Sequence, residues 1–388
     1  MNIKDFFFTK QSAPITPIQA PAQEMMQFST PFGRIGEGNL SLPYIRAYSH
    51  TEPYIRFGSD NLFPQLINQM YYTSPLNSGI INFKVNAVIG GGFELKTNNT
   101  TARSKVDEYT FMKLNKFQKL SKQLTQDLIM HNRVYVKMCK LPNGRISYHR
   151  IAPEKVRTNY HKTFYTISDD WARSIDIHQL LPYTPDFECE CLYAYECETA
   201  GQDIYPIPSY CSSLNWSFVD GEMAYLQKSN IINSIFPSFM ITMATKFKSQ
   251  EEAQAFKDVI NKAKGAQESG RVLAFVSEFS ENLPSVTALP QNNNDKLFIE
   301  TITNLEANIC RSHSIDPLIL GIRVSGKLGS GNELAQSYTI FEKNVVHPLR
   351  DEMEEILNDL LYIGGINSVL EINDYQIIDN EITEVKKY

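Results

Sequence analysis

The residues whose spacing most suggests chemistry lie in "GIRVSGKLGSGNE", residues 321–333. Gly321, Gly326 and Lys327 have the spacing of a phosphate-binding loop, in which the lysine is followed by Ser or Thr. In that motif the hydroxyl ligates Mg²⁺, and the amides of a following helix face the phosphates. This chain has Leu328 at the hydroxyl position. The pattern therefore favours a Gly/Ser-rich loop before a helix over a nucleotide site, and we expect no cofactor.

Cysteine and histidine offer no stronger site. The six cysteines contain no C-x-x-C pair. In "FECECLYAYEC" (187–197) the side chains alternate, so one strand face is expected to carry Phe187, Cys189, Cys191, Tyr193, Tyr195 and Cys197. These thiols lack His or Cys partners at zinc-like spacing, and we interpret them as small apolar strand residues, with no metal site.

No known catalytic constellation is present either, because the seven histidines are scattered and neither H-E-x-x-H nor G-x-S-x-G occurs. His313 and His347 are expected on a helix surface or in an interface. Glu352, Glu354 and Glu355 are expected on the polar side of an amphipathic helix, either solvated or in a subunit contact. The sequence thus predicts no catalytic residues and no enzyme.

Composition sets broad limits on function. The 388 residues are 42% hydrophobic and 21% charged, which is ordinary for a globular protein. The net charge of −6 argues against a broad DNA-gripping surface, but it does not exclude a protein that DNA passes through. No apolar run reaches the roughly 18 residues of a membrane span, and the apolar core of the N-terminus is too short for a signal peptide. These features predict a cytosolic protein without membrane contact.

The first half of the chain predicts helices ahead of a mainly antiparallel sheet. Residues 1–40 are rich in Pro, Gln, Ser and Thr and predict a loosely ordered arm. "SPLNSGIINFKVNAVIGGG" predicts a helix with Ser74 as its cap and Pro75 first, stopped by three glycines before a strand at "FELK". A helical region at 102–130 leads to the hairpin "RVYVKMCK", "LPNGR", "ISYHRI".

The second half predicts two long helices with a small module between them. The first covers 212–236 and ends at Pro237. A β-α-β-β module follows, with strands at "SFMITMATKF", "RVLAFVS" and "SVTAL" and a helix opened by the capping box of Ser249 and Glu252. The second long helix begins near Asp295 and stops at "SIDP".

A third long helix follows the loop that opened this section. Ser330 and Glu333 form its capping box, and Pro348 in its middle removes a backbone donor and is expected to bend it. Its apolar positions at helical spacing are Leu334, Tyr338, Phe341, Val345, Leu349, Ile356 and Leu360.

This order of elements resembles the portal proteins of tailed double-stranded-DNA bacteriophages. The resemblance rests on "SIDPLILG" (314–321) and "NELAQSYTIFEKNVVHPLRDEMEEILNDLL" (332–361), and on "TSPLNSGIINFKVNAVIGGGFEL" and "RIAPEKVR" earlier in the chain. Residues at places where such portals carry similar ones are Pro317, Leu320, Gly321, Glu333, Phe341 and Pro348. It covers residues 55–362, and the order of many weak motifs carries it. The short stretch after residue 362 departs from the family pattern and leaves little for a helical crown.

The resemblance implies an α+β portal fold that assembles as a ring, twelvefold in the mature particle. It implies these parts in chain order: a flexible N-terminal arm (1–40), a mixed α/β wing (41–211), a first stem helix (212–237), a small β-α-β-β clip (238–292), a second stem helix (293–313), a tunnel loop (314–331), a long kinked helix that returns to the wing (332–362) and a short C-terminal segment with a reduced crown (363–388).

The resemblance also implies that the tunnel loop faces DNA, through Gly321, Arg323, Ser325, Gly326, Lys327, Gly329, Ser330 and Gly331. The glycines would supply backbone freedom beside a moving duplex. Arg323 and Lys327 would touch phosphates transiently, or else are solvated charges of an exposed loop.

The partners implied are double-stranded DNA passing without sequence readout, the terminase large subunit, the major capsid protein and head-completion or tail adaptor proteins. The implied location is the capsid vertex of a virion, with assembly in the host cytoplasm.

Two other readings stay open on the sequence. One is a P-loop-like nucleotide-binding enzyme that uses Gly321–Lys327, which Leu328 disfavours. The other is a non-ring interaction protein of a virion or conjugative element, which would share the helices but need no closed symmetry.

Overall fold

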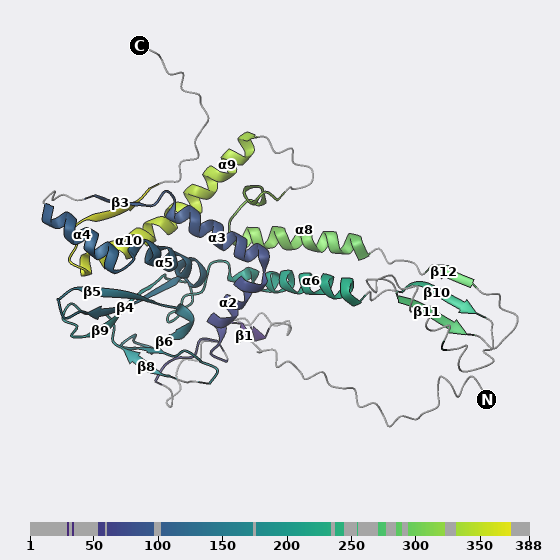
Figure 1. Ribbon diagram of the computed structural model, residues 1–388, viewed down its shortest axis with the longest axis horizontal. Helices are drawn as coiled ribbons and strands as arrows, with labels where there is room; N and C mark the ends of the chain where they lie inside the picture. Colours follow the sequence, from purple (N-terminus) through teal and green to yellow (C-terminus); the bar gives the residue numbers. More distant parts are fainter. Residues whose placement is uncertain are drawn as a thin grey trace, which may run out of the picture. The chain divides into compact units, whose positions relative to one another are not determined.

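The structure is a computed structural model that describes residues 29–30, 33–34, 53–58, 60–96, 102–173, 176–233, 237–243, 254, 271–276, 285–288, 294–322 and 331–373. Helices and short sheets alternate along it, as predicted, and no sheet within these residues closes into a barrel (Figure 1). The described residues fall into two compact units: one contains Val219–Asn304, and the other contains Phe28–Phe218 and Leu305–Tyr388. Among the described helices, none has both the length and the hydropathy to cross a bilayer.

The larger unit starts with two short strands and two helices. Strands β1 (Ser29–Thr30) and β2 (Gly33–Arg34) pair within the predicted arm. Helix α2 (Phe63–Thr73) is followed at once by α3 (Pro75–Ile89). As predicted, Ser74 caps α3: its side chain accepts a hydrogen bond from the backbone N–H of Asn77 at 3.2 Å.

The next helical region is two helices rather than one. Helix α4 (Ala102–Leu114) and helix α5 (Phe117–His131) are separated by Asn115 and Lys116. Lys116 has a left-handed backbone with φ 46°. The cause lies in the tertiary structure, because the buried Asn115 accepts a hydrogen bond from the backbone N–H of Tyr148 at 2.8 Å. A local pattern could not reveal this break.

Three antiparallel sheets complete this unit. The first has the order β5-β4-β9 and contains the predicted hairpin, with Gly144 in the turn at φ 77°. The second has the order β6-β7-β8, and its residues share a core cluster with Tyr135 and Leu192 of the first. The bounds are β4 Arg133–Lys140, β5 Ile146–Ile151, β6 Val156–Thr158, β7 Tyr165–Ile167, β8 His178–Leu180 and β9 Glu190–Glu196, with a 3-10 turn η1 at Pro153–Lys155.

The third sheet includes part of the C-terminal segment. Strand β13 (Val369–Ile372) pairs antiparallel with β3 (Phe93–Lys96), so this stretch joins a sheet of the larger unit, and the reduced crown stays a prediction. Strand β9 is also shorter than "FECECLYAYEC" suggested. It begins at Glu190, which leaves Phe187 and the exposed Cys189 outside the alternating face.

The smaller unit holds the predicted β-α-β-β strands. Its sheet has the order β11-β10-β12, with β10 parallel to β11 and antiparallel to β12. A parallel pair needs a crossover connection, and Gln254 in that connection is helical, while the rest of the predicted helix lies outside the described residues. The strands are β10 Pro237–Met243, β11 Arg271–Val276 and β12 Ser285–Ala288. The chain passes between the units within the helices α6 (Leu214–Asn233) and α8 (Asn294–Ser312), and a 3-10 turn, η2 (Cys211–Ser213), precedes α6 in the larger unit.

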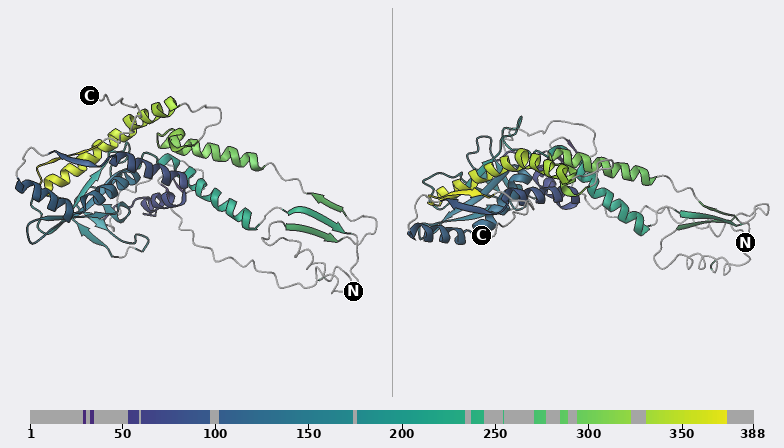
Figure 2. Two further views of the ribbon diagram at one scale, coloured as in Figure 1. Left: turned by 45° about the horizontal axis from the view of Figure 1, so that its top comes forward. Right: turned by 90° about the horizontal axis from the view of Figure 1, so that it is seen from above.

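The third long helix is interrupted close to the predicted place. Helix α9 (Gly331–Phe341) passes through a π-helical turn, η4 (Glu342–Val346), into α10 (His347–Ile363). Pro348 stands in the first turn of α10, where its missing N–H is best tolerated. Figure 2 shows α9 and α10 following one another in two further views.

Candidate functional site

The predicted tunnel loop is framed by well-defined ends. Before it, α8 leads into a short 3-10 helix, η3 (Pro317–Leu320), which Asp316 caps by accepting a hydrogen bond from the N–H of Leu318 at 3.0 Å. After it, α9 begins. Ser337 on α9 donates a hydrogen bond to the other carboxylate oxygen of Asp316 at 3.2 Å. One carboxylate therefore ties the two ends of the loop together.

The structure describes only the edges of the predicted DNA-facing set. Gly321 ends η3 with a left-handed φ of 77°, which is why a glycine suits this position. Gly331 is already the first residue of α9, so it belongs to the helix and not to the loop. The residues Arg323, Ser325, Gly326, Lys327, Gly329 and Ser330 lie outside the described residues.

The frame of this loop differs from that of a nucleotide-binding loop. A P-loop connects a β-strand to a helix. Here the residues before Gly321 form the helix α8 and the 3-10 turn η3. This geometry, together with Leu328, disfavours the nucleotide reading.

His313, which immediately follows α8 and precedes the loop, is buried. The prediction of a surface or interface position for it is therefore wrong. Only 1% of the residue is exposed. Its Nε2 lies 2.9 Å from Oδ1 of Asn77, and its ring stacks on Tyr210 with centroids 4.5 Å apart. Tyr210 in turn donates a hydrogen bond to the carbonyl of Met130 at 3.0 Å. The histidine thereby joins the end of α8 to α3 and to the residue before η2.

Electrostatics keep this anchor neutral. Burial, and then the charge of Lys84, hold the pKa of His313 well below its ordinary value. Lys84 is itself buried on α3, and burial lowers its pKa to about 8. Protonation of His313 would place a second cation in this buried cluster. At neutral pH the imidazole therefore stays neutral and keeps its contacts with Asn77 and Tyr210.

Three carboxylates of α10 also make hydrogen bonds within the chain, while Glu355 remains exposed, in keeping with the predicted polar face. A subunit contact through these residues stays a prediction. Glu352 accepts a hydrogen bond from the thiol of Cys197 at 3.4 Å, and Glu355 accepts one from the hydroxyl of Tyr195 at 3.3 Å. Glu354 accepts one from the backbone N–H of Ile372 at 2.7 Å. These bonds hold α10 against strands β9 and β13.

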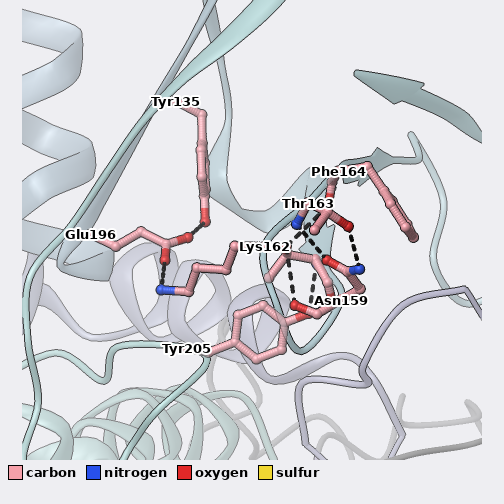
Figure 3. A network of polar contacts seen from close by, with 8 residues as sticks. Tyr135, Asn159, Lys162, Thr163, Phe164, Glu196 and Tyr205 are labelled. Carbon is pink, nitrogen blue, oxygen red and sulfur yellow. Dashed lines mark hydrogen bonds and ion pairs between the residues drawn. The ribbon is translucent and has the colours of Figure 1, made fainter. Parts of the chain in front are cut away.

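A further polar network, which sequence reasoning missed, fixes strands β4 and β9 to the hairpin of β6 and β7. Figure 3 shows the carboxylate of Glu196 accepting from the hydroxyl of Tyr135 and pairing with Lys162 at 2.5 Å. Burial and the neighbouring carboxylate hold the pKa of Tyr135 well above its ordinary value, so its hydroxyl stays a donor. Nearby, Tyr205 donates to the carbonyl of Ile55 at 2.6 Å. The network positions the sheet rather than moving protons.

A polar hollow of about 390 Å³ borders this network. Its charged lining residues are Lys162, Glu196, Glu198 and Asp203. Three carboxylates against one lysine disfavour phosphate, so the hollow does not offer the nucleotide site that the loop lacks. Among the described residues, no group of three His, Cys, Asp or Glu side chains is arranged to hold a metal ion.

Comparison with known proteins supports the fold. No protein-family model and no curated protein sequence matches the chain. Among solved structures, a chain in the virion of a native gene transfer agent particle matches with a TM-score of 0.59 and 14% identity, over 81% of this chain and 84% of that one. A chain in the neck of an empty particle of this kind, computed with C6 symmetry, matches with a TM-score of 0.60, 14% identity and the same coverage.

A third match is a chain in the neck of the native particle computed with C12 symmetry, with a TM-score of 0.56 and 14% identity over 80% of this chain and 83% of that one. At 14% identity these matches show a shared fold. The chain has the fold of a component of phage-like particles, and the resemblance to portal proteins is confirmed at that level.

Proposed function

We propose that the chain is the portal subunit of a phage-like particle, with twelve copies forming a ring at one capsid vertex through which double-stranded DNA is packaged and ejected. The observation that supports it is the fold shared over 81% of the chain with a component of a particle neck. The related neck structures were computed with C6 and C12 symmetry, as a ring of identical subunits would allow.

Uncovered apolar side chains on the long helices give independent support for assembly. They are Tyr225 (69% exposed) and Leu226 on α6, Ile299 (64%) on α8, and Leu334 and Ile340 (61%) on α9. A single exposed apolar residue is ordinary, but such residues recur on three helices. In the proposed ring, neighbouring copies cover them.

The proposed parts follow from this assignment. Helices α6 and α8 are the stem, and the β11-β10-β12 sheet is the clip that meets the terminase large subunit and later the head-completion or tail adaptors. The larger unit is the wing, which meets the major capsid protein. Residues 323–330 are the DNA-facing part of the tunnel loop, and Asp316 joins the flanking η3 and α9 by its bonds to Leu318 and Ser337.

The contacts of His313 and Asp316 support this proposal, because they fix the residues on either side of the loop. A loop that guides DNA must keep its ends in place while its middle moves. Asp316 holds the two loop ends, and His313 anchors the end of α8 in the core. Arg323 and Lys327 would then contribute weak, salt-screened phosphate contacts from each copy around the ring.

The first test is native mass spectrometry of the purified full chain with negative-stain images of the same sample. The proposal predicts rings of about a dozen copies with a central hole. Ile340→Glu should yield smaller species, because it places a charge in the proposed contact, while Gln336→Glu on the same helix adds the same charge and should leave rings intact. A chain that stays monomeric and also binds ATP would overturn the proposal.

The nucleotide-binding alternative has its own test. Lys327→Ala would abolish ATP binding in a P-loop enzyme, whereas the portal subunit has none to lose. Equilibrium binding of a fluorescent ATP analogue to the parent and the variant separates the two readings.

A further inference from the structure

The corner between α4 and α5 carries lysines that the tunnel loop does not involve. We define the lysine surface as Lys113, Lys116, Lys119 and Lys122, all of which are exposed. Residues 109–126 contain these four lysines and no Asp or Glu, although the whole chain has a net charge of −6. The acidic balance of the chain is thus reversed locally.

Some other surface lysines of this unit are paired with carboxylates, whereas the exposed Lys105, Lys140 and Lys343 are not. Lys137 lies 2.7 Å from Glu190, and Lys155 lies 2.7 Å from Asp169. In the part of the chain that the structure describes, no member of the lysine surface lies within 4.0 Å of a carboxylate oxygen. These four positive charges lie within ten residues of sequence, and a partner of opposite charge would offset their mutual repulsion.

The corner also holds these lysines on a rigid support. Asn115, between the two helices, is buried and bonds to the N–H of Tyr148 and to the carbonyl of Phe111 at 3.2 Å. Lys116 follows directly, and its carbonyl accepts the N–H of Lys119 at 2.8 Å to open α5. Backbone positions are therefore set before any partner arrives, which lowers the entropic cost of binding.

The charges at the start of α5 are opposite to those that stabilise a helix. This helix has no side-chain cap and no acidic residue in its first turn, and Lys116 stands at the cap position. Cations at the positive end of a helix destabilise it, and an anion there offsets the cost. An exposed tyrosine, Tyr109 at 67%, lies beside the group, with Nζ of Lys113 5.8 Å from its ring centroid.

We propose that the lysine surface binds the phosphate backbone of duplex DNA without reading its sequence. Lysine ammonium groups on flexible stems suit repeated single phosphates, which carry no sequence information. The choice of DNA rather than an acidic protein rests on the proposed portal function. The surface gives the wing a DNA contact separate from the tunnel loop.

The test measures binding of a fluorescent 30-base-pair duplex to the full chain by anisotropy at several salt concentrations. The patch variant is Lys116→Gln with Lys119→Gln, and the control is Lys137→Gln with Lys155→Gln, which removes the same charge from paired lysines. The patch variant should bind about tenfold or more weakly near 0.1 M salt, and its salt slope should fall by about 2, because each lost phosphate contact contributes about 0.9. The control should bind as the parent does.

Three results would overturn the inference: no duplex binding by the parent, equal weakening in both variants, or displacement of the duplex by polyaspartate at equal charge concentration, which would indicate an acidic protein partner. Thermal unfolding guards against misfolding, because removing cations from the start of α5 should keep or raise the midpoint. Native mass spectrometry of both variants separates this inference from the proposed ring. If the patch variant forms intact rings and binds DNA as the parent does, only the lysine surface is rejected. If the proteins are monomers and only the patch variant binds DNA more weakly, only the ring is rejected.

Discussion

Replacing His313 with Asn should change how the stability of the larger unit depends on pH. In the folded chain His313 is buried against Asn77 and Tyr210, and burial with the charge of Lys84 holds its pKa well below the ordinary value. In the unfolded chain the pKa returns to about 6.5. Between these two pKa values the unfolded state therefore binds a proton at His313 that the folded state does not bind.

The sign and size of the effect follow from this difference. The stabilising contribution is complete above about pH 6.5 and is lost as the pH falls below it, by about 1.4 kcal/mol per pH unit. Between pH 6.5 and 5 one such histidine costs about 2 kcal/mol. His131, with a lowered pKa, and Asp127, with a raised pKa, also contribute to the pH dependence, with opposite signs, but both proteins share them. His313→Asn should therefore lose about 2 kcal/mol less than the parent over the same range.

Urea unfolding followed by tryptophan fluorescence gives the free energy of unfolding at each pH. Both tryptophans, Trp171 and Trp216, lie in the same unit as His313, and Trp171 is 4% exposed. His347→Asn, at a half-buried position on α10, makes the same substitution elsewhere in the unit and is the control. If His313→Asn shows the parental slope, the reasoning from burial is refuted. At pH 7 it should also cost about 2 kcal/mol through lost stacking and packing.

Four further substitutions test backbone and packing inferences by thermal or urea unfolding. Gly79→Ala should stabilise by about 0.5 to 1 kcal/mol, because the site lies inside α3 with open space around the added carbon. Gly321→Ala should destabilise by about 1 kcal/mol, since φ is 77° although space is also open there, and a stabilised variant would contradict the left-handed assignment. Gly364→Ala should destabilise by about 1 to 3 kcal/mol, because its new carbon would lie 2.3 Å from the ring of Phe111, and an unchanged midpoint would refute that close approach. Asn115→Ala should cost about 1 to 3 kcal/mol by leaving a buried N–H without its acceptor, and neutrality would show that the corner is set by other contacts.

Several features followed from the sequence alone because their causes are local. Ser74 and Pro75 predict the start of α3, and the Asn143-Gly144 pair predicts the turn between β4 and β5. The alternating strands of the small module were also found by their pattern, and the structure confirms β10, β11 and β12. In each case the residues that decide the structure lie within a few positions of one another.

The tertiary structure alone decided the roles of the polar residues near the predicted loop. The residues near His313 in the sequence predict a helix-surface position for it, yet it bonds to Asn77, 236 positions away. Tyr195 reaches Glu355 across 160 positions, and Asn115 breaks a helical region by bonding to Tyr148. A buried polar group needs a partner, and that partner can come from any part of the chain that folding brings near. Local patterns therefore predict which elements form, while distant contacts decide which polar side chains are buried and what they hold in place.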